Sequence, residues 1–269
     1  MKSFVGLLLA VCITLPACSA ENSSTTSPVA ASPEPAAAVT TPEPAGQPVL
    51  AQVTEPVAPA ATPQAEPSAA ASMPVTAPAP RPDIVAGRHY RVLTPAQPTS
   101  SSPDKVEVAE VFMYSCPHCM SFEPFIQNYL AEKPAYVSFV RIPASFNKMA
   151  RVHSKAYYAA ETLGVLEDVH ADFFTEFHNK RNRLDSEEEI ITFFARHGVD
   201  KDAATKAFGS FAVDTKLRQA DNLGRRYGID SVPALVINGK YVTSGSMTGS
   251  ISKLREVVDY LTAKEAAAL

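Results

Sequence analysis

The segment from Lys105 to Ile142 constrains the fold more than any other part of the chain. It begins with KVEVAEVFMY, an apolar run of strand length, and it ends with a second such run, YVSFVRI. Between the two runs, Pro117 fits the first turn of a helix, where no backbone N–H donor is needed. Strands joined through a crossover helix pair in parallel, so the segment predicts a β–α–β unit of an α/β domain.

A long helical stretch follows this unit. Apolar residues recur at helical spacing from about residue 147 to 227, and short breaks are expected at Gly164, at 182–186 and at Gly198. Outside this stretch, the pattern predicts a short strand at 88–93, a β-hairpin from strands at 234–238 and 241–244, and a terminal helix at about 250–267. The expected architecture is therefore a β–α–β unit and a β–β–α unit, interrupted by a helical insertion.

The N-terminus has the pattern of an export signal. Lys2 supplies a positive charge, and the apolar run from Phe4 to Leu15 is too short to span a bilayer comfortably. The run ends in LPACS, which resembles a bacterial lipobox, so residues 1–18 are expected to be a lipoprotein-type signal with Cys18 as the lipidated residue. An ordinary signal peptide cleaved after Ala17 is the alternative. Both interpretations place the protein in an oxidising compartment. If Cys18 is lipidated, Ser19 in place of an acidic residue favours the outer membrane.

Residues 19–86 are expected to be a Pro/Ala-rich tether, and residues 87–269 the folded domain. The stretch 22–84 contains fourteen prolines and no aromatic residue, which favours extended polyproline II over a packed core. Six acidic and two basic residues precede Gly87, so the remaining part of the chain carries no net formal charge. This balance gives no indication of a nucleic-acid partner.

The expected domain contains only two cysteines, Cys116 and Cys119, because Cys12 and Cys18 belong to the signal. A zinc site would need two further ligands, and the candidate histidines offer no second closely spaced pair. These candidates are His118, His153, His170, His178 and His197. A purely structural disulfide would close a very short loop and stabilise little. A redox-active pair is the favoured interpretation of a CxxC motif at a strand-to-helix junction.

Local physical chemistry assigns the two thiols different roles. At a helix N-cap, Cys116 faces unpaired N–H groups and the positive end of the helix dipole, which should stabilise a thiolate and make it the nucleophile. Cys119, less exposed, is expected to be the resolving thiol. Pro117 stiffens the turn, and His118 can donate a hydrogen bond or a positive charge to Cys116, unless it is an inert surface residue. Stabilising the reduced form makes such a site an oxidant.

The sequence VEVAEVFMYSCPHCMSFEPF, from Val106 to Phe125, resembles the signature of the DsbA family of periplasmic disulfide donors. The resemblance implies a thioredoxin-like fold with an inserted helical domain. It also implies that Glu110 is a buried acid that assists proton transfer beneath the cysteines, the alternative being an ordinary strand-edge carboxylate. Glu123 matches a family acid, although a solvated helix surface explains that residue equally well.

The sequence YGIDSVPA, from Tyr227 to Ala234, resembles the thioredoxin-fold loop whose proline is cis and packs against the cysteines. By this resemblance, the Val232–Pro233 bond is cis, and the Val232 backbone pairs with an extended substrate peptide. An ordinary trans proline before a strand is the alternative.

Together these features predict a periplasmic thiol:disulfide oxidoreductase that donates the Cys116–Cys119 disulfide to reduced exported proteins. No cofactor or metal is expected beyond that disulfide, and the resemblance implies reoxidation by a DsbB-type membrane partner. A disulfide reductase or isomerase, or a non-catalytic peptide-binding chaperone module, is the alternative function. A tether stands where isomerases of this compartment have a dimerisation domain, so a monomer is expected.

Overall fold

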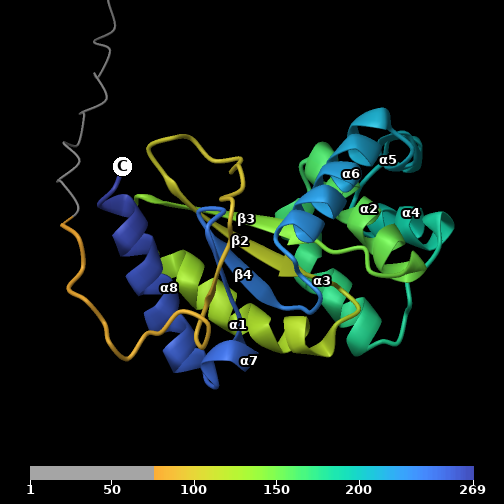
Figure 1. The fold of residues 1–269 in the computed structure, drawn as a ribbon. Helices are drawn as coiled ribbons and strands as arrows, with labels where there is room; N and C mark the ends of the chain where they lie inside the picture. The colour runs from red at the N-terminus through yellow and green to blue at the C-terminus, as the bar shows by residue number, and fades with distance from the viewer. Residues whose placement is uncertain (1–75) are drawn as a thin grey trace, which may run out of the picture. The chain divides into compact units, whose positions relative to one another are not determined.

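The computed structural model describes residues 76–269, and its centre is strand β2 (Val106–Phe112). Every residue of β2 is buried because the strand lies between β3 (Val137–Pro143) and β4 (Ala234–Ile237). The five-stranded sheet has the order β1-β5-β4-β2-β3, in which β2 and β3 are parallel and β4 is antiparallel to β2 (Figure 1). The predicted β–α–β unit is therefore confirmed, and β3 is the edge strand next to β2.

Helices α1 (Pro117–Glu132) and α8 (Ile251–Ala266) pack together on one side of the sheet (Figure 1). Their apolar side chains form a buried cluster with alternate residues of the strands. The cluster includes Phe122, Ile126 and Tyr129 of α1, Leu254, Val257, Val258 and Leu261 of α8, and Val106, Val108, Leu235 and Ile237 of the sheet. This cluster fixes α1, and with it both cysteines, against the sheet.

Replacing Leu261 with Ala is expected to lower the free energy of unfolding by about 2–4 kcal/mol, because the fully buried side chain would leave a cavity between α8 and the sheet. Urea denaturation monitored by circular dichroism measures the change. Lys264→Ala, at an exposed position of the same helix, is the control and should change stability by less than about 0.5 kcal/mol. Equal effects of the two substitutions would contradict this packing.

The helical insertion between β3 and β4 contains five helices and agrees with the expected limits of about 147 and 227. They are α2 (Lys148–Leu163), α3 (Leu166–His178), α4 (Glu187–Arg196), α5 (Lys201–Phe208) and α6 (Phe211–Arg226). The breaks expected at Gly164, 182–186 and Gly198 are present, but a further break at Gly209 was not predicted. It arises because the Ser210 side chain accepts a hydrogen bond from the Val213 N–H and caps a new helix.

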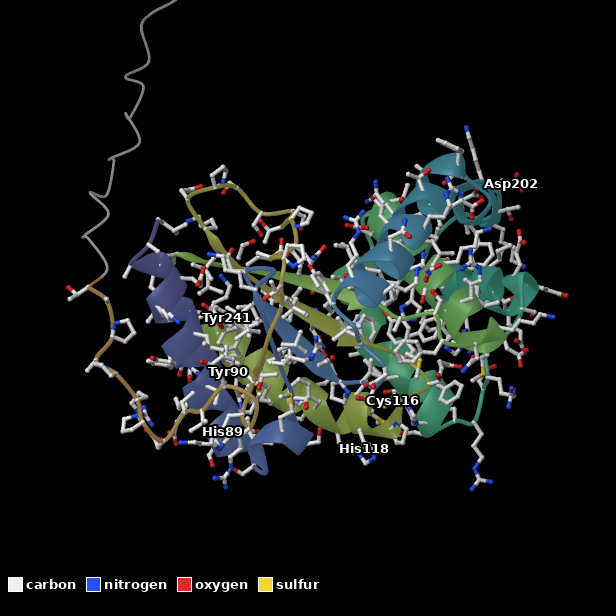
Figure 2. The ribbon with its side chains drawn as sticks, viewed as in Figure 1. His89, Tyr90, Cys116, His118, Asp202 and Tyr241 are labelled. Atoms are coloured by element: carbon white, nitrogen blue, oxygen red, sulfur yellow. The ribbon has the colours of Figure 1, made fainter. Side chains whose placement is uncertain are left out.

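The predicted hairpin is formed by β4 and β5 (Tyr241–Thr243). Its turn needs glycine at position 239, where φ is +62° and a Cβ would lie 2.0 Å from the Gln97 carbonyl oxygen. The expected first strand is reduced to β1 (Arg91–Val92), antiparallel to β5. Tyr90, beside it, packs edge-on against Tyr241 with 5.5 Å between ring centroids (Figure 2). A short unpredicted helix, α7 (Gly245–Thr248), precedes α8.

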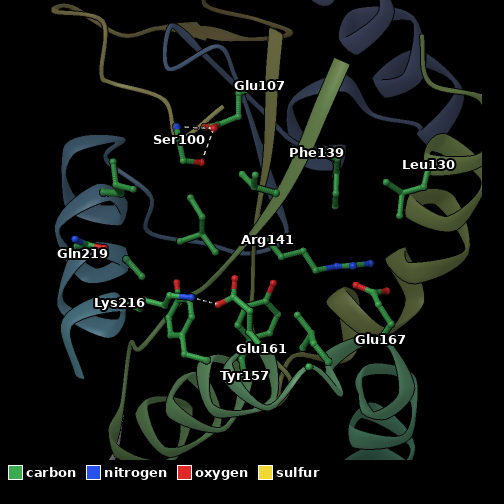
Figure 3. A pocket seen from close by; sticks show the side chains of 17 residues that line it. Ser100, Glu107, Leu130, Phe139, Arg141, Tyr157, Glu161, Glu167, Lys216 and Gln219 are labelled. Atoms are coloured by element: carbon green, nitrogen blue, oxygen red, sulfur yellow. Dashed lines mark hydrogen bonds and ion pairs between the residues drawn. The ribbon is translucent and has the colours of Figure 1, made fainter. Parts of the chain in front are cut away.

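A cavity of about 640 Å³ lies along the open edge of β3 (Figure 3). Its walls come from β3, α1 and the helices of the insertion, and they include Phe139, Tyr157 and Tyr158. Arg141 lies in this wall and extends from β3 toward α1 (Figure 3). Neither cysteine lines the cavity.

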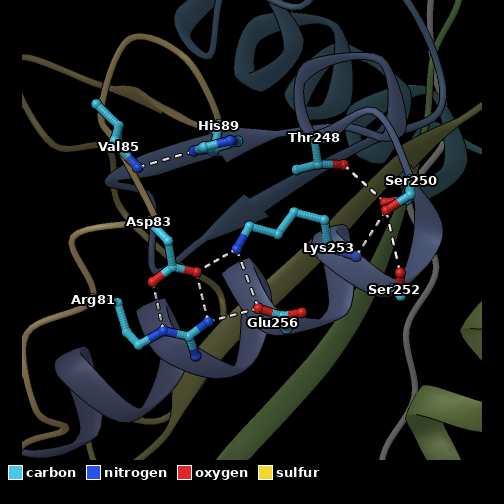
Figure 4. A network of polar contacts seen from close by, with 9 residues as sticks. All are labelled: Arg81, Asp83, Val85, His89, Thr248, Ser250, Ser252, Lys253 and Glu256. Atoms are coloured by element: carbon cyan, nitrogen blue, oxygen red, sulfur yellow. Dashed lines mark hydrogen bonds and ion pairs between the residues drawn. The ribbon is translucent and has the colours of Figure 1, made fainter.

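The ordered packing begins earlier than residue 87, the expected start of the domain. Ile84 is buried in the cluster between α8 and the sheet, and Arg81 and Asp83 form ion pairs with Lys253 and Glu256 of α8 (Figure 4). These pairs are exposed and add little stability, so the buried Ile84 is the stronger anchor. The expected tether boundary at residue 86 is therefore several residues too late. The signal and Cys18 lie outside the described residues.

No helix within residues 76–269 is both long and apolar enough to cross a membrane.

Candidate functional site

The two cysteines lie at the start of α1, at the end of the helix that faces the insertion (Figures 1 and 2). Cys116 is the N-cap residue with extended backbone (φ −92°, ψ 117°), and Pro117 is the first helical residue, as predicted. Both thiols are free, so the structure represents the dithiol form. Cys116 is 8% exposed and Cys119 is completely buried, which agrees with a reactive first thiol and a protected second one.

The Cys116 side chain does not cap the helix in the dithiol form. Its sulfur lies 3.6 Å from the Val232 carbonyl oxygen, to which the thiol donates a hydrogen bond. We expected the thiol to face the free N–H groups of the helix, but in the dithiol form it makes a tertiary contact instead. The partner comes from a loop that lies 116 residues further along the chain.

The Val232–Pro233 bond is cis, as the resemblance implies. It lies in the loop between α6 and β4, and the sheet holds this loop against Cys116 because β4 pairs directly with β2. Val232 and Pro233 also line an open groove of about 510 Å³ beside the cysteines. Their predicted role, pairing with a substrate backbone, stays a prediction.

His118 and Pro117 are exposed on the first turn of α1. His118 lines the same groove as Val232 and Pro233, and Phe122 and Ile251 add apolar surface to it. Among the described residues, no hydrogen bond joins His118 to Cys116 in the dithiol form. The imidazole is thus next to the redox pair and accessible to a partner, and its influence on Cys116 stays a prediction.

Cys119 lies in an environment that opposes its ionisation. Burial raises the pKa of this thiol well above its ordinary value, and the neighbouring Cys116 and Glu110 contribute in the same direction. A thiol that stays protonated until a base removes its proton suits the resolving role expected of Cys119.

Glu110 is a fully buried carboxyl group in β2, so the alternative of a strand-edge carboxylate is wrong. One oxygen, Oε2, accepts a hydrogen bond of 3.2 Å from Nε of Arg141, the residue opposite it in β3, whereas Oε1 has no partner within residues 76–269. Burial raises the pKa of Glu110 to about 8, the negative charge of Glu123 adds to the shift, and Arg141 opposes it. A carboxyl group that titrates near neutral pH can both accept and donate a proton.

Glu123 is not on a solvated helix surface, because its side chain is only 16% exposed. Its two oxygens accept from different donors, Oε2 from Arg141 Nη2 at 3.2 Å and Oε1 from His170 Nε2 at 3.3 Å. Arg141 therefore bridges Glu110 and Glu123, and the ion network links β2, β3, α1 and α3.

The roles of Arg141, Tyr114 and two histidines of the insertion were not predicted from the sequence. Arg141 could have been noticed because it is a positive charge inside the apolar run YVSFVRI. A charge buried in a strand needs a partner of opposite charge, so the run indicates a buried acid nearby. His170 and His178 entered only as possible zinc ligands. They bond instead to Tyr114, which precedes Cys116 by two residues: His170 Nδ1 to its hydroxyl and His178 Nε2 to its carbonyl, both at 2.8 Å.

Within the part of the chain that the structure describes, no group of three or more His, Cys, Asp or Glu side chains is arranged to hold a metal ion. The residues brought together are two thiols of unequal exposure, a buried carboxyl group and an open groove. This arrangement can perform thiol–disulfide exchange, in which Cys116 meets a partner and Cys119 completes the exchange.

Comparison with known proteins agrees with this chemistry. Residues 139–253 match the family model of a DSBA-like thioredoxin domain. The chain is 39% identical over 186 residues to the thiol:disulfide interchange protein DsbA of Azotobacter vinelandii and 38% identical to that of Pseudomonas aeruginosa, covering 69% of this chain and 86% and 88% of the relatives. The crystal structure of P. aeruginosa DsbA superposes with a TM-score of 0.66, covering 69% of this chain and 96% of that one.

The fold and the paired thiols, with these relatives, define a thioredoxin-like thiol:disulfide oxidoreductase with an inserted helical domain. Within that class, the chain belongs to the DsbA family of thiol:disulfide interchange proteins.

Proposed function

We propose that the protein acts in the periplasm as a disulfide donor, passing the Cys116–Cys119 disulfide to reduced exported proteins. The observation that carries this proposal is the unequal pair: Cys116 keeps some exposure and its thiol bonds to the carbonyl of Val232, a residue that lines the open groove, whereas Cys119 is fully buried. A substrate thiolate attacks the Cys116 sulfur, and Cys119 leaves as a thiol after taking a proton. A second substrate thiol then displaces Cys116, so the substrate gains a disulfide and the protein becomes the dithiol.

The substrate peptide is proposed to lie in the groove lined by His118, Val232 and Pro233, with the Val232 backbone pairing as a strand would. Glu110 is proposed to supply or accept the proton of Cys119. The disulfide is the only redox group required, and a DsbB-type membrane protein regenerates it, with the protein acting as a monomer.

The reduction potential separates a donor from a reductase. Equilibration of the described domain with defined ratios of reduced and oxidised glutathione should give a potential nearer to −120 mV, as in strong disulfide donors, than to about −270 mV, as in thioredoxin. In a parallel assay, the oxidised domain should transfer one disulfide per molecule to a reduced, unfolded protein. A potential in the thioredoxin range would contradict the donor proposal and favour the reductase.

From the sequence alone, we also propose that Cys18 carries the lipid and that the Pro/Ala-rich segment tethers the domain to the outer membrane. Mass spectrometry of the N-terminal peptide of the exported protein should show acyl chains on Cys18. Cys18→Ala should release the protein into the soluble periplasmic fraction. An unmodified N-terminus that begins at Cys18 would contradict the lipid anchor.

A further inference from the structure

Helix α3 of the inserted domain places a histidine in contact with two residues that flank the cysteines in the sequence. The His170 ring is buried, with a side-chain exposure of 6%, and both its nitrogens have partners. Nδ1 lies 2.8 Å from the Tyr114 hydroxyl, and Nε2 lies 3.3 Å from Oε1 of Glu123. Tyr114 precedes Cys116 by two residues, and Glu123 lies one turn beyond Cys119 on α1.

The partners of His170 determine its tautomer. Burial lowers the pKa of His170, so the imidazole is neutral and carries a single N–H. The carboxylate of Glu123 can only accept, which places that N–H on Nε2. Nδ1 is then an acceptor for the Tyr114 hydroxyl, which keeps its proton because burial raises the pKa of Tyr114. The hydrogen bonds therefore run in one direction, from Tyr114 to His170 and from His170 to Glu123.

The second oxygen of Glu123 binds the guanidinium group on which Glu110 also depends. Arg141 donates through Nη2 to Glu123 and through Nε to Glu110, at 3.2 Å in both cases. The guanidinium is nearly buried, and the second oxygen of Glu110 has no hydrogen-bond partner among the residues that the structure describes. Any change that loosens Glu123 from Arg141 therefore frees the guanidinium to pair more fully with Glu110.

We propose that His170 is a positioning residue of the redox reaction. Its hydrogen bond holds the Glu123 carboxylate against Arg141, so that the Arg141 guanidinium donates to both Glu123 and Glu110. Through this shared guanidinium, the inserted helical domain sets the proton affinity of the carboxyl group beneath Cys119. The inference rests on the proposed function, because it concerns the proton that Cys119 exchanges.

The charges predict the direction of the effect. Burial acts to raise the pKa of Glu123, but the hydrogen bond from His170 and the charge of Arg141 outweigh it, so the pKa is lowered. Ionised Glu123 in turn helps to raise the pKa of Glu110. Without His170, Glu123 takes up a proton more readily, so its electrostatic repulsion of ionised Glu110 weakens. The Arg141 guanidinium then pairs more strongly with Glu110. The pKa of Glu110 should then fall.

Other titratable groups also face this network. Tyr157 of α2 contacts the His170 ring, with 6.4 Å between centroids, and Glu167 of α3 acts on His170 through its charge. Cys119 of α1 faces Glu110. None of these groups is altered by the variants chosen below, so a change in the titration of Glu110 reports on His170 and Glu123.

Two amide replacements separate the contacts of His170. Gln carries its amide nitrogen about as far from the backbone as Nε2 and can donate to Glu123, whereas the shorter Asn reaches only the position of Nδ1, near Tyr114. The side-chain carboxyl carbon of Glu110, assigned with Glu110→Gln, is followed by ¹³C NMR against pH in the dithiol protein. His170→Asn should lower the pKa of Glu110 by about one unit, and His170→Gln should restore most of the shift.

The double variant tests whether His170 acts through Glu123. In a Glu123→Gln background, the carboxylate is absent, so His170→Asn should produce no further shift of the Glu110 titration. An unchanged titration in His170→Asn, or an equal additional shift in the Glu123→Gln background, would overturn the inference. The titration needs no substrate, so a shift in a protein without donor activity would contradict the proposed function and leave the positioning role standing.

Discussion

Cys116→Ser is expected to abolish disulfide transfer to a reduced protein, whereas Cys119→Ser should stop the reaction at a mixed disulfide. The Cys116 thiol is partly exposed and bonds to Val232, which lines the open groove, whereas Cys119 is completely buried, so Cys116 is the thiol that meets an external thiol or disulfide. In Cys119→Ser, a disulfide reagent such as oxidised glutathione reacts with Cys116, and no second thiol displaces the product.

The measurement is the oxidation rate of a reduced, unfolded protein, with mass spectrometry of the species that accumulate. Cys116→Ser should reduce the rate at least about a thousandfold, to that of the uncatalysed reaction, and form no adduct. Cys119→Ser should accumulate an adduct of one glutathione per chain. Ser115→Ala, beside the site, is the control and should keep the wild-type course. Full oxidation by Cys116→Ser, or glutathione bound at Cys119 in the wild type, would contradict the assigned roles.

Glu110→Gln is expected to remove a pH dependence of stability. The ordinary pKa of a glutamate is about 4.3, and the folded dithiol protein raises that of Glu110 to about 8. Between these values, the folded protein holds a proton that the unfolded chain releases. The contribution of Glu110 is therefore complete below about pH 4 and is lost as the pH rises through 8. The variant has no such proton, so its stability should exceed that of the wild type increasingly toward pH 8.

Urea denaturation under reducing conditions at several pH values between 4.5 and 8 tests this expectation. The difference in unfolding free energy between variant and wild type should change by about 4 kcal/mol across the range. This window lies below the ordinary pKa of a thiol, so Cys119 does not contribute. The loss of stability in acid, where His153, His170 and Glu176 have lowered pKa values, should be shared by both proteins. If the unfolding free energies of variant and wild type changed in parallel from pH 4.5 to 8, Glu110 would be ionised throughout this range.

Local patterns predicted the elements that carry the cysteines. Two features were enough: the apolar runs that form β2 and β3, and the proline at the start of α1. Each determines the local backbone conformation over a few residues, so the resulting strands and helix can be predicted from the sequence. The limits of the insertion were predicted for the same reason. Gly209 ends one helix and Ser210 caps the next, a pair of residues typical of a helix break. The break was not predicted because the apolar residues keep their helical spacing across it.

The surroundings of the cysteines depend on contacts between distant segments. Glu110 was suspected from a resemblance, but its burial follows from the place of β2 between β3 and β4. Arg141 becomes its partner because the parallel register places the two residues opposite each other. Nothing in the local pattern of α3 indicates that His170 reaches Glu123, since that contact depends on how the insertion packs against α1.

The sequence by itself determined that two thiols stand at a strand-to-helix junction of an α/β domain, because strand and helix periodicity and the position of Pro117 are local properties. Only the tertiary structure decided what those thiols meet: the Val232 carbonyl at Cys116, and near Cys119 the buried carboxyl group of Glu110 with its partner Arg141. These contacts depend on sheet order, strand register and the packing of the insertion. Each joins residues far apart in the chain, and burial gives their charges an influence that they would not have in water.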